Sequence, residues 1–234
     1  SWLIGLLAVM VFFMSLFPSF RDQVGLFEGV IAKFPKAFVD ALGLANMDFG
    51  SVLGFYGFTF SYITLVAAIF SMKTGMGIIS EEIRIRAADF LIAKPVSRFS
   101  IMLWKGLSIL ANITIVVLVY SVAAYLMCSS MAEGGIDNGI FIALSLGFYL
   151  ICLFFMAFGM MLGAFFKRVR TVLPTVMGMV FGFFAIRFLS TSFPDAHLDY
   201  FTPFCYFDVE KILMDGRMDM EHLWLCIALT LAFT

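Results

Sequence analysis

The chain has 234 residues, of which 62% are hydrophobic and 13% are charged, with a formal net charge of −1 and a mean hydropathy of +1.03. A soluble domain of this length has room for one ordinary core, but it could not keep several apolar runs of twenty or more residues away from water. The composition therefore excludes a soluble globular protein and indicates a membrane protein with several spans.

In chain order, the apolar segments predict an all-α, polytopic membrane helical bundle with six transmembrane helices in a single domain, residues 1–234. The spans lie at about 2–17, 56–79, 101–127, 139–166, 172–189 and 223–234. Because ~20 residues are needed to cross the hydrocarbon core, we interpret the first and last spans as trimmed. Segment 2–17 lacks the basic start and the small-residue cleavage site of a signal peptide, and we interpret it as a span.

The distribution of basic residues predicts how the chain sits in the membrane. With six spans, the connections alternate between the two sides. The connections at 73–105 and 166–171 together carry nine Lys or Arg and three Asp or Glu, whereas the rest of the chain carries six and thirteen. By the positive-inside rule the first set is cytoplasmic, and both termini are then cytoplasmic as well.

Two acidic segments, at about 18–55 and 190–222, are then expected on the outer side. In the second, Thr202 is a candidate N-cap, Pro203 suits the first helical position and Gly216 is a candidate helix stop. These residues predict a short extracytoplasmic helix between the fifth and sixth spans, either outside the membrane or dipping back into it.

The stretch 80–106 gathers eight of the 31 charged residues. Residues 80–94 include good helix formers and no Gly or Pro, so a helix is predicted there, and Pro95 ends it. The helix carries a polar line with Glu82, Arg86 and Asp89 and two apolar lines, one with Ile83, Ala87, Phe90 and Leu91 and one roughly opposite with Ile85 and Ile92. One apolar face can lie on the membrane or on the bundle, whereas a second one requires deeper burial or a partner.

The same stretch continues into a second helix. Ser97 can cap a helix that leads into the third span. Residues 80–98 therefore form a predicted L-shaped cytoplasmic element, a helix followed by the sharp turn KPVSR, which we call the elbow.

The elbow resembles a region of ABC-2 type transporter permeases in which a Glu-rich helix after the second span precedes a pattern LLa-x-PvsR-x-x-i-x-x-K. The matching residues are Glu81, Glu82, Phe90, Leu91, Lys94, Pro95, Val96, Ser97, Arg98, Ile101 and Lys105. The stretches KFPKAFVDALGL, before the second span, and YFTPFCYFDVEKIL, after the fifth, are similar to the family as well, so the resemblance covers most of the chain. The family's Gly-Thr pair is absent at 84–88, which leaves the register of the elbow helix open.

The resemblance implies the membrane-spanning permease subunit of an ATP-binding-cassette exporter, acting on a hydrophobic or amphipathic substrate such as a lipid, a peptide or a drug. Its partners would be a cytoplasmic ATP-binding-cassette ATPase subunit, which would hold ATP and Mg, and a second permease subunit, identical or related. No catalytic site, metal, cofactor or nucleic-acid partner is expected for this chain itself. The expected location is the bacterial plasma membrane, in contact with membrane lipid.

In the family, the elbow is the coupling helix that docks into a groove on the ATPase. The resemblance then assigns polar contacts with the ATPase to Glu81, Glu82 and Arg86, an apolar docking face to Phe90 and Leu91, and the turn to Lys94, Pro95 and Arg98. This assignment would supply the partner that the second apolar line of the elbow requires.

Two features of the spans leave alternatives open. Gly159 and Gly163 in the fourth span, and Gly178 and Gly182 in the fifth, are GxxxG pairs that let helices approach closely, either within the subunit or across a dimer. A disulfide between Cys128 and Cys205 is conceivable if both face outward, with free thiols as the alternative.

Functions of two other classes fit some of the same residues. EEIRIR fits the EExxxR signature of intramembrane CAAX-type proteases and FPDAH fits their FxxxH, but the topology places Glu81 and Glu82 a membrane thickness, ~30 Å, away from His197. A secondary transporter or a channel is the other alternative. It is disfavoured because the span interiors lack the acidic residues of a proton relay.

Overall fold

The structure is a computed structural model. It describes residues 2–21, 23–31, 33–35, 39, 48–85, 98–132, 135–165, 171–192, 198–207, 209, 212–213 and 220–233, with the side chains of 26–28, 79–85, 98–103, 191–192 and 198–199 outside the description. The regular elements in these ranges are α1 (Trp2–Arg21), α2 (Val24–Ile31), α4 (Val52–Ile85), α6 (Arg98–Met131), α7 (Asn138–Phe165), α8 (Val172–Ser192), η2 (Leu198–Phe201), α9 (Pro203–Tyr206) and α11 (Met220–Phe233). Since every one of them is helical, the predicted all-α bundle is confirmed.

Five of these helices are long and apolar enough to cross a membrane. The candidate spans are Trp2–Arg21, Val52–Ile78, Trp104–Met131, Asn138–Phe165 and Val172–Ser190. The segment predicted as a sixth span falls on α11, which has 14 residues and would cover about 21 Å, less than the ~30 Å of a hydrocarbon core. The described residues therefore form a polytopic membrane helical bundle.

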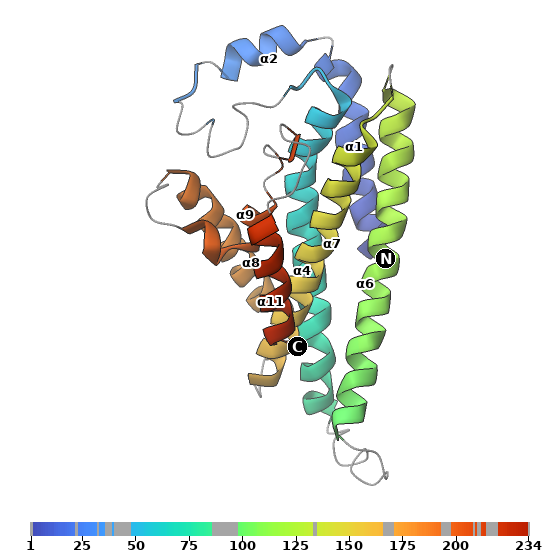
Figure 1. The fold of residues 1–234 in the computed structure, drawn as a ribbon, viewed down its shortest axis with the longest axis vertical. Coiled ribbons are helices and arrows are strands. Elements are labelled where there is room, and N and C mark those ends of the chain that lie inside the picture. The colour runs from blue at the N-terminus through green and yellow to red at the C-terminus, as the bar shows by residue number, and fades with distance from the viewer. Residues whose placement is uncertain are drawn as a thin grey trace.

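Helices α4 and α7 form the centre of the bundle. About half of each candidate span is buried, whereas only 11% of the candidate span in α8 is buried. Figure 1 shows α4 and α7 side by side, with α1 and α6 flanking them on one side and α8, α9 and α11 on the other. The short helix α2 lies across one end of the bundle, beyond the end of α1.

A buried aromatic cluster joins α4, α6 and α7. The ring of Tyr120 lies 4.9 Å from that of Phe148, and the ring of Tyr56 lies 5.8 Å from that of Phe141, measured between centroids. The hydroxyl groups of Tyr56 and Tyr120 are 3.3 Å apart and form a hydrogen bond inside the core. Because both tyrosines are almost fully buried, each hydroxyl depends on the other for its partner.

We expect Tyr56→Phe or Tyr120→Phe alone to lower the free energy of unfolding by about 1–3 kcal/mol, because each leaves one buried hydroxyl without its partner. The double substitution removes both polar groups and should cost less than either single change. Thermal unfolding of the purified protein in detergent checks this order. Additive losses in the double variant would show that the two hydroxyl groups do not depend on each other.

The structure changes three details of the sequence-based expectations. First, α4 continues without a break through Ser80, Glu81 and Glu82 to Ile85, so the second span and the start of the elbow are one helix. Second, Lys73 and Lys105, taken as the ends of a connection, both lie inside helices. In α4, the residues that follow the span are good helix formers and include no Gly or Pro that would end the helix.

The third detail concerns Thr202, the predicted N-cap. It does directly precede α9, but its hydroxyl makes no capping hydrogen bond. Instead, the hydroxyl donates to the carbonyl oxygen of Phe183 on α8 over 2.9 Å and so ties the two helices together. The helix α9 itself ends at Tyr206, with Phe207 as its C-cap, well before Gly216, the predicted stop, which lies outside the described residues.

The cysteines are free thiols. Cys128 is buried in the bundle on α6, and Cys205 is half-buried on α9. Cys205 lies 3.3 Å from the hydroxyl of Ser190 on α8. Of the two alternatives stated for this pair, the structure has the free thiols.

Candidate functional site: the elbow end of α4 and α6

The candidate site lies where α4 ends and α6 begins. Both helices reach the same end of the bundle, at the bottom of Figure 1, which we call the elbow end. The chain leaves α4 at Ile85 and enters α6 at Arg98, so the segment 86–97 connects the two helix ends. This end therefore carries the segment that the sequence singled out.

Both helices extend beyond their candidate spans at the elbow end. Each has 34 residues, and at ~1.5 Å per residue each is about 51 Å long, well above the ~30 Å of a hydrocarbon core. The span in α4 ends at Ile78 and that in α6 begins at Trp104. Residues 79–85 and 98–103 thus project about 10 Å past the spans as two adjacent helical extensions.

The structure places three of the eight predicted docking residues by their backbone. Glu81 and Glu82 lie in the extension of α4, and Arg98 is the first residue of α6, while none of their side chains is described. Arg86, Phe90, Leu91, Lys94 and Pro95 lie outside the described residues. The structure thus brings the two ends of the predicted elbow to one place and leaves the contacts of its side chains as a prediction.

The backbones of α4 and α7 approach each other closely at two glycines. Gly75 on α4 faces the carbonyl oxygen of Met156 on α7, and Gly159 on α7 faces the carbonyl oxygen of Met72 on α4. At each glycine there is no room for a Cβ atom. Small residues let helix backbones approach this closely, so α4 and α7 are in direct backbone contact at this level.

Of the two predicted glycine pairs, only the one in α7 includes a residue of this contact. Gly159 is part of it, and Gly163, one turn further along α7, is buried. In contrast, Gly178 and Gly182 on α8 have no atom within 4 Å of a built Cβ among the described residues. The sequence singled out Gly159 but missed its counterpart Gly75, because Gly75 belongs to no GxxxG pair.

A second contact missed by sequence reasoning ties α1 to α4. The Lys73 ammonium nitrogen lies 5.1 Å from the centroid of the Trp2 ring, a cation–π geometry. The Trp2 ring also packs on Phe70, with centroids 5.5 Å apart. The only local sign of this contact was a lysine inside an apolar run.

The arrangement does not gather the protease signature. Glu81 and Glu82 lie at the elbow end, whereas Leu198, next to His197, starts η2, which contacts α9 away from that end (Figure 1). His197 itself lies outside the described residues. Within the described part of the chain, no group of three His, Cys, Asp or Glu side chains could hold a metal ion.

These features define a multi-pass membrane protein in which two long helices extend past their candidate spans at the same end of the bundle. A family model described as ABC-2 family transporter protein matches residues 1–199, most of the chain. The chain therefore belongs to this family and is a permease component of an ABC transporter. Neither the curated proteins nor the solved structures that were searched contain a match.

Proposed function

We propose that this chain is the membrane-spanning permease subunit of an ATP-binding-cassette exporter for a hydrophobic or amphipathic substrate, working as a dimer with two cytoplasmic ATPase subunits. ATP and Mg are held by the ATPase, and this chain performs no chemistry of its own. The elbow end faces the cytoplasm of a bacterial cell, because the basic residues gather on that side.

The observation that carries the proposal is the pair of helical extensions at the elbow end. A docking element works as a lever only when it is rigidly joined to the parts that move. Here α4 is one unbroken helix from Val52 to Ile85, and it contacts α7 through the backbone at Gly75 and Gly159. Closure of the ATPase subunits would thus displace the elbow and, with it, α4, α6 and α7.

The proposal predicts that the ATPase is held by the elbow. Co-expressed with its neighbouring ATPase, the full-length permease should retain it in a pull-down, and Phe90→Asp or Arg86→Glu should reduce the retained ATPase at least tenfold. An acid placed on the predicted apolar docking face, or a reversed charge, opposes association with the ATPase.

The matched control is Ser130→Asp, which also adds an acid but lies exposed at the opposite end of α6. It should leave the retained ATPase unchanged. Equal retention by the wild type and by both elbow variants, with all proteins eluting as folded species, would overturn the docking role.

A further inference from the structure

A groove between α6 and α7 lies on the face of the bundle that carries α6, away from α8, α9 and α11. It has a volume of about 650 Å³ and runs from Thr114 to Leu126 along α6, about 18 Å at ~1.5 Å per residue. Its rim consists of exposed apolar side chains, among them Leu118, Val122 and Leu146. Both helices belong to candidate membrane spans, so the groove opens toward lipid.

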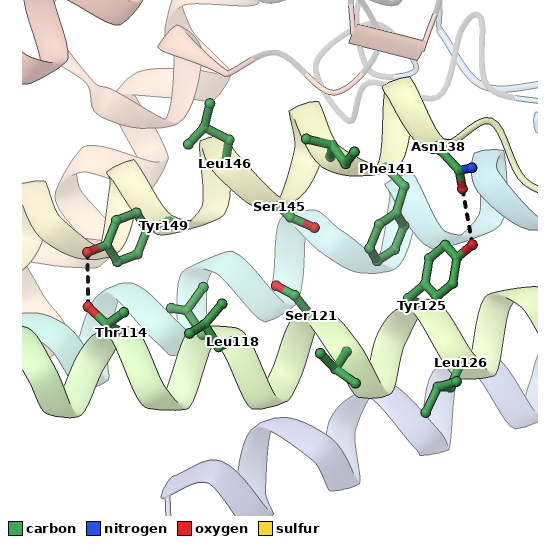
Figure 2. A pocket seen from close by; sticks show the side chains of 13 residues that line it. Thr114, Leu118, Ser121, Tyr125, Leu126, Asn138, Phe141, Ser145, Leu146 and Tyr149 are labelled. Atoms are coloured by element: carbon green, nitrogen blue, oxygen red, sulfur yellow. Dashed lines mark hydrogen bonds between the residues drawn. The ribbon is translucent and has the colours of Figure 1, made fainter.

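Polar groups occur at three levels of this apolar groove (Figure 2). At one end Tyr149 bonds Thr114 over 2.9 Å, and Thr114 also donates to the carbonyl of Leu110, so Tyr149 is the donor to Thr114. At the other end Tyr125 donates to the side-chain oxygen of Asn138 over 3.1 Å. The hydroxyl groups at both ends are therefore satisfied.

The middle level differs. Figure 2 shows the hydroxyl groups of Ser121 and Ser145 at the same level, in the space between α6 and α7, and neither has a hydrogen-bond partner among the described residues. Most other helical hydroxyls in the described chain, such as those of Ser108, Ser129 and Ser130, donate to a carbonyl of their own helix. The hydroxyls of Ser121 and Ser145 instead face an apolar groove. Because lipid hydrocarbon offers no hydrogen-bond acceptor, both hydroxyls are available as donors to a ligand.

The depth of this serine pair suits the linkage of an acyl lipid. Ser121 lies ten residues from Met131, about 15 Å, and Ser145 lies seven residues from Asn138, about 10 Å. Because the interfacial layer takes up ~5–7 Å on each side of the bilayer, Ser145 lies ~3–5 Å and Ser121 ~8–10 Å inside the hydrocarbon boundary. An ester or amide carbonyl at that depth could accept both hydroxyls, with its chain extending toward Thr114.

The size of the groove suits a small ligand. Its volume of about 650 Å³ lies within the ~300–1,000 Å³ that is typical of ligand pockets. None of the lining residues is charged, so the groove offers no counter-ion to an ionic head group.

We propose that the α6–α7 groove binds one neutral acyl lipid from the bilayer, whose ester or amide carbonyl accepts hydrogen bonds from Ser121 and Ser145, whose chain lies between Leu118 and Leu146, and whose head group lies beside Tyr125 and Asn138. This binding requires no ATPase. It can therefore fail or succeed independently of the proposed transport function.

The test uses the isolated permease in phosphatidylcholine nanodiscs with two photoreactive probes. One is a monoacylglycerol with a diazirine in its chain, and the other is the glycerol ether of the same chain, which lacks the carbonyl. The ester probe should cross-link to peptides of α6 and α7 that contain Ser121 or Ser145. The double variant S121A/S145A should lower this yield at least about fivefold and bring it near that of the ether, the combined effect of two hydrogen bonds at the lower end of their usual strength.

Two variants complete the design. Leu118→Trp, at a largely exposed side chain, fills the groove and should abolish labelling by both probes while the protein elutes normally. Ser108→Ala removes a hydroxyl of the same helix that is bonded to its own backbone and should change nothing. Equal labelling by ester and ether, labelling spread over all lipid-facing helices, or labelling unaffected by Leu118→Trp would each overturn the proposal.

Discussion

Replacing Gly75 with alanine is expected to lower the melting temperature of the permease by about 3–10 °C, whereas the same change two residues later, Gly77→Ala, should leave it unchanged or raise it. A methyl group at Gly75 meets the carbonyl oxygen of Met156, a backbone atom that cannot rotate away, so α4 and α7 must separate. Overpacking of this kind costs about 1–3 kcal/mol, and 1 kcal/mol corresponds to ~2–4 °C in a chain of this size.

The control is informative because Gly77 lies in the same helix with no described atom within 4 Å of a built Cβ. There alanine brings only its higher helix propensity, about 1 kcal/mol in favour of the helix. Gly159→Ala should behave like Gly75→Ala, because it meets the carbonyl of Met72. Scanning fluorimetry in detergent measures all three. Similar melting temperatures for Gly75→Ala and Gly77→Ala would contradict a backbone contact between α4 and α7.

These two glycines also show where sequence reasoning ends. Gly75 and Gly77 stand in the stretch KTGMG with almost identical neighbours, and nothing local tells the buried glycine from the open one. The difference comes from Met156, which is 81 residues away in the chain. A GxxxG pattern does not identify the closely packed glycines either. Gly159 lies at the contact between α4 and α7, whereas Gly178 and Gly182 have no described atom within 4 Å of a built Cβ.

The bundle itself was predictable because its signal is local. An apolar run of ~20 residues can satisfy its backbone in lipid only as a helix, so the length of each run indicates a span. The extension of α4 was predicted only in part. The helix formers from Ser80 on indicated a helix, but this helix was expected as a new element, whereas in the structure it continues the span. Pattern alone does not distinguish one long helix from two joined ones.

The groove between α6 and α7 could not be predicted. Ser121 and Ser145 are 24 residues apart, and a single hydroxyl in a membrane helix normally bonds to its own backbone, as Ser108 does. Only the packing of the two helices puts both hydroxyls at one level of an apolar wall (Figure 2). A pair of hydroxyls without partners is a property of the assembled bundle.

The continuity of α4 leads to the second large effect. We expect Ser80→Pro to preserve association with the ATPase within about twofold but to abolish the movement that ATP drives in the membrane. Proline at this position removes a helical N–H and clashes with the carbonyl of Met76, which breaks or kinks the helix at a cost of ~3 kcal/mol. The break falls at the first residue of the elbow, beyond the Gly75 contact, so residues 81–98 keep their sequence but lose their rigid connection to the bundle.

The movement can be measured as the distance between spin labels at Ser130 in the two permease subunits, at the end of α6 opposite the elbow. In the wild-type complex this distance should differ by several ångströms between the nucleotide-free and ATP-bound states; with Ser80→Pro the two states should give the same distance. Ser80→Ala keeps the helix and should behave like the wild type, because alanine is the best helix former. If Ser80→Pro kept the full ATP-driven change in distance, the movement would reach the bundle by another route, through α6 alone. The unbroken α4 would then not be the helix that transmits it. Loss of the ATPase itself from Ser80→Pro would instead show that docking requires the α4 extension as a helix, contrary to the expectation that the elbow binds through its own sequence.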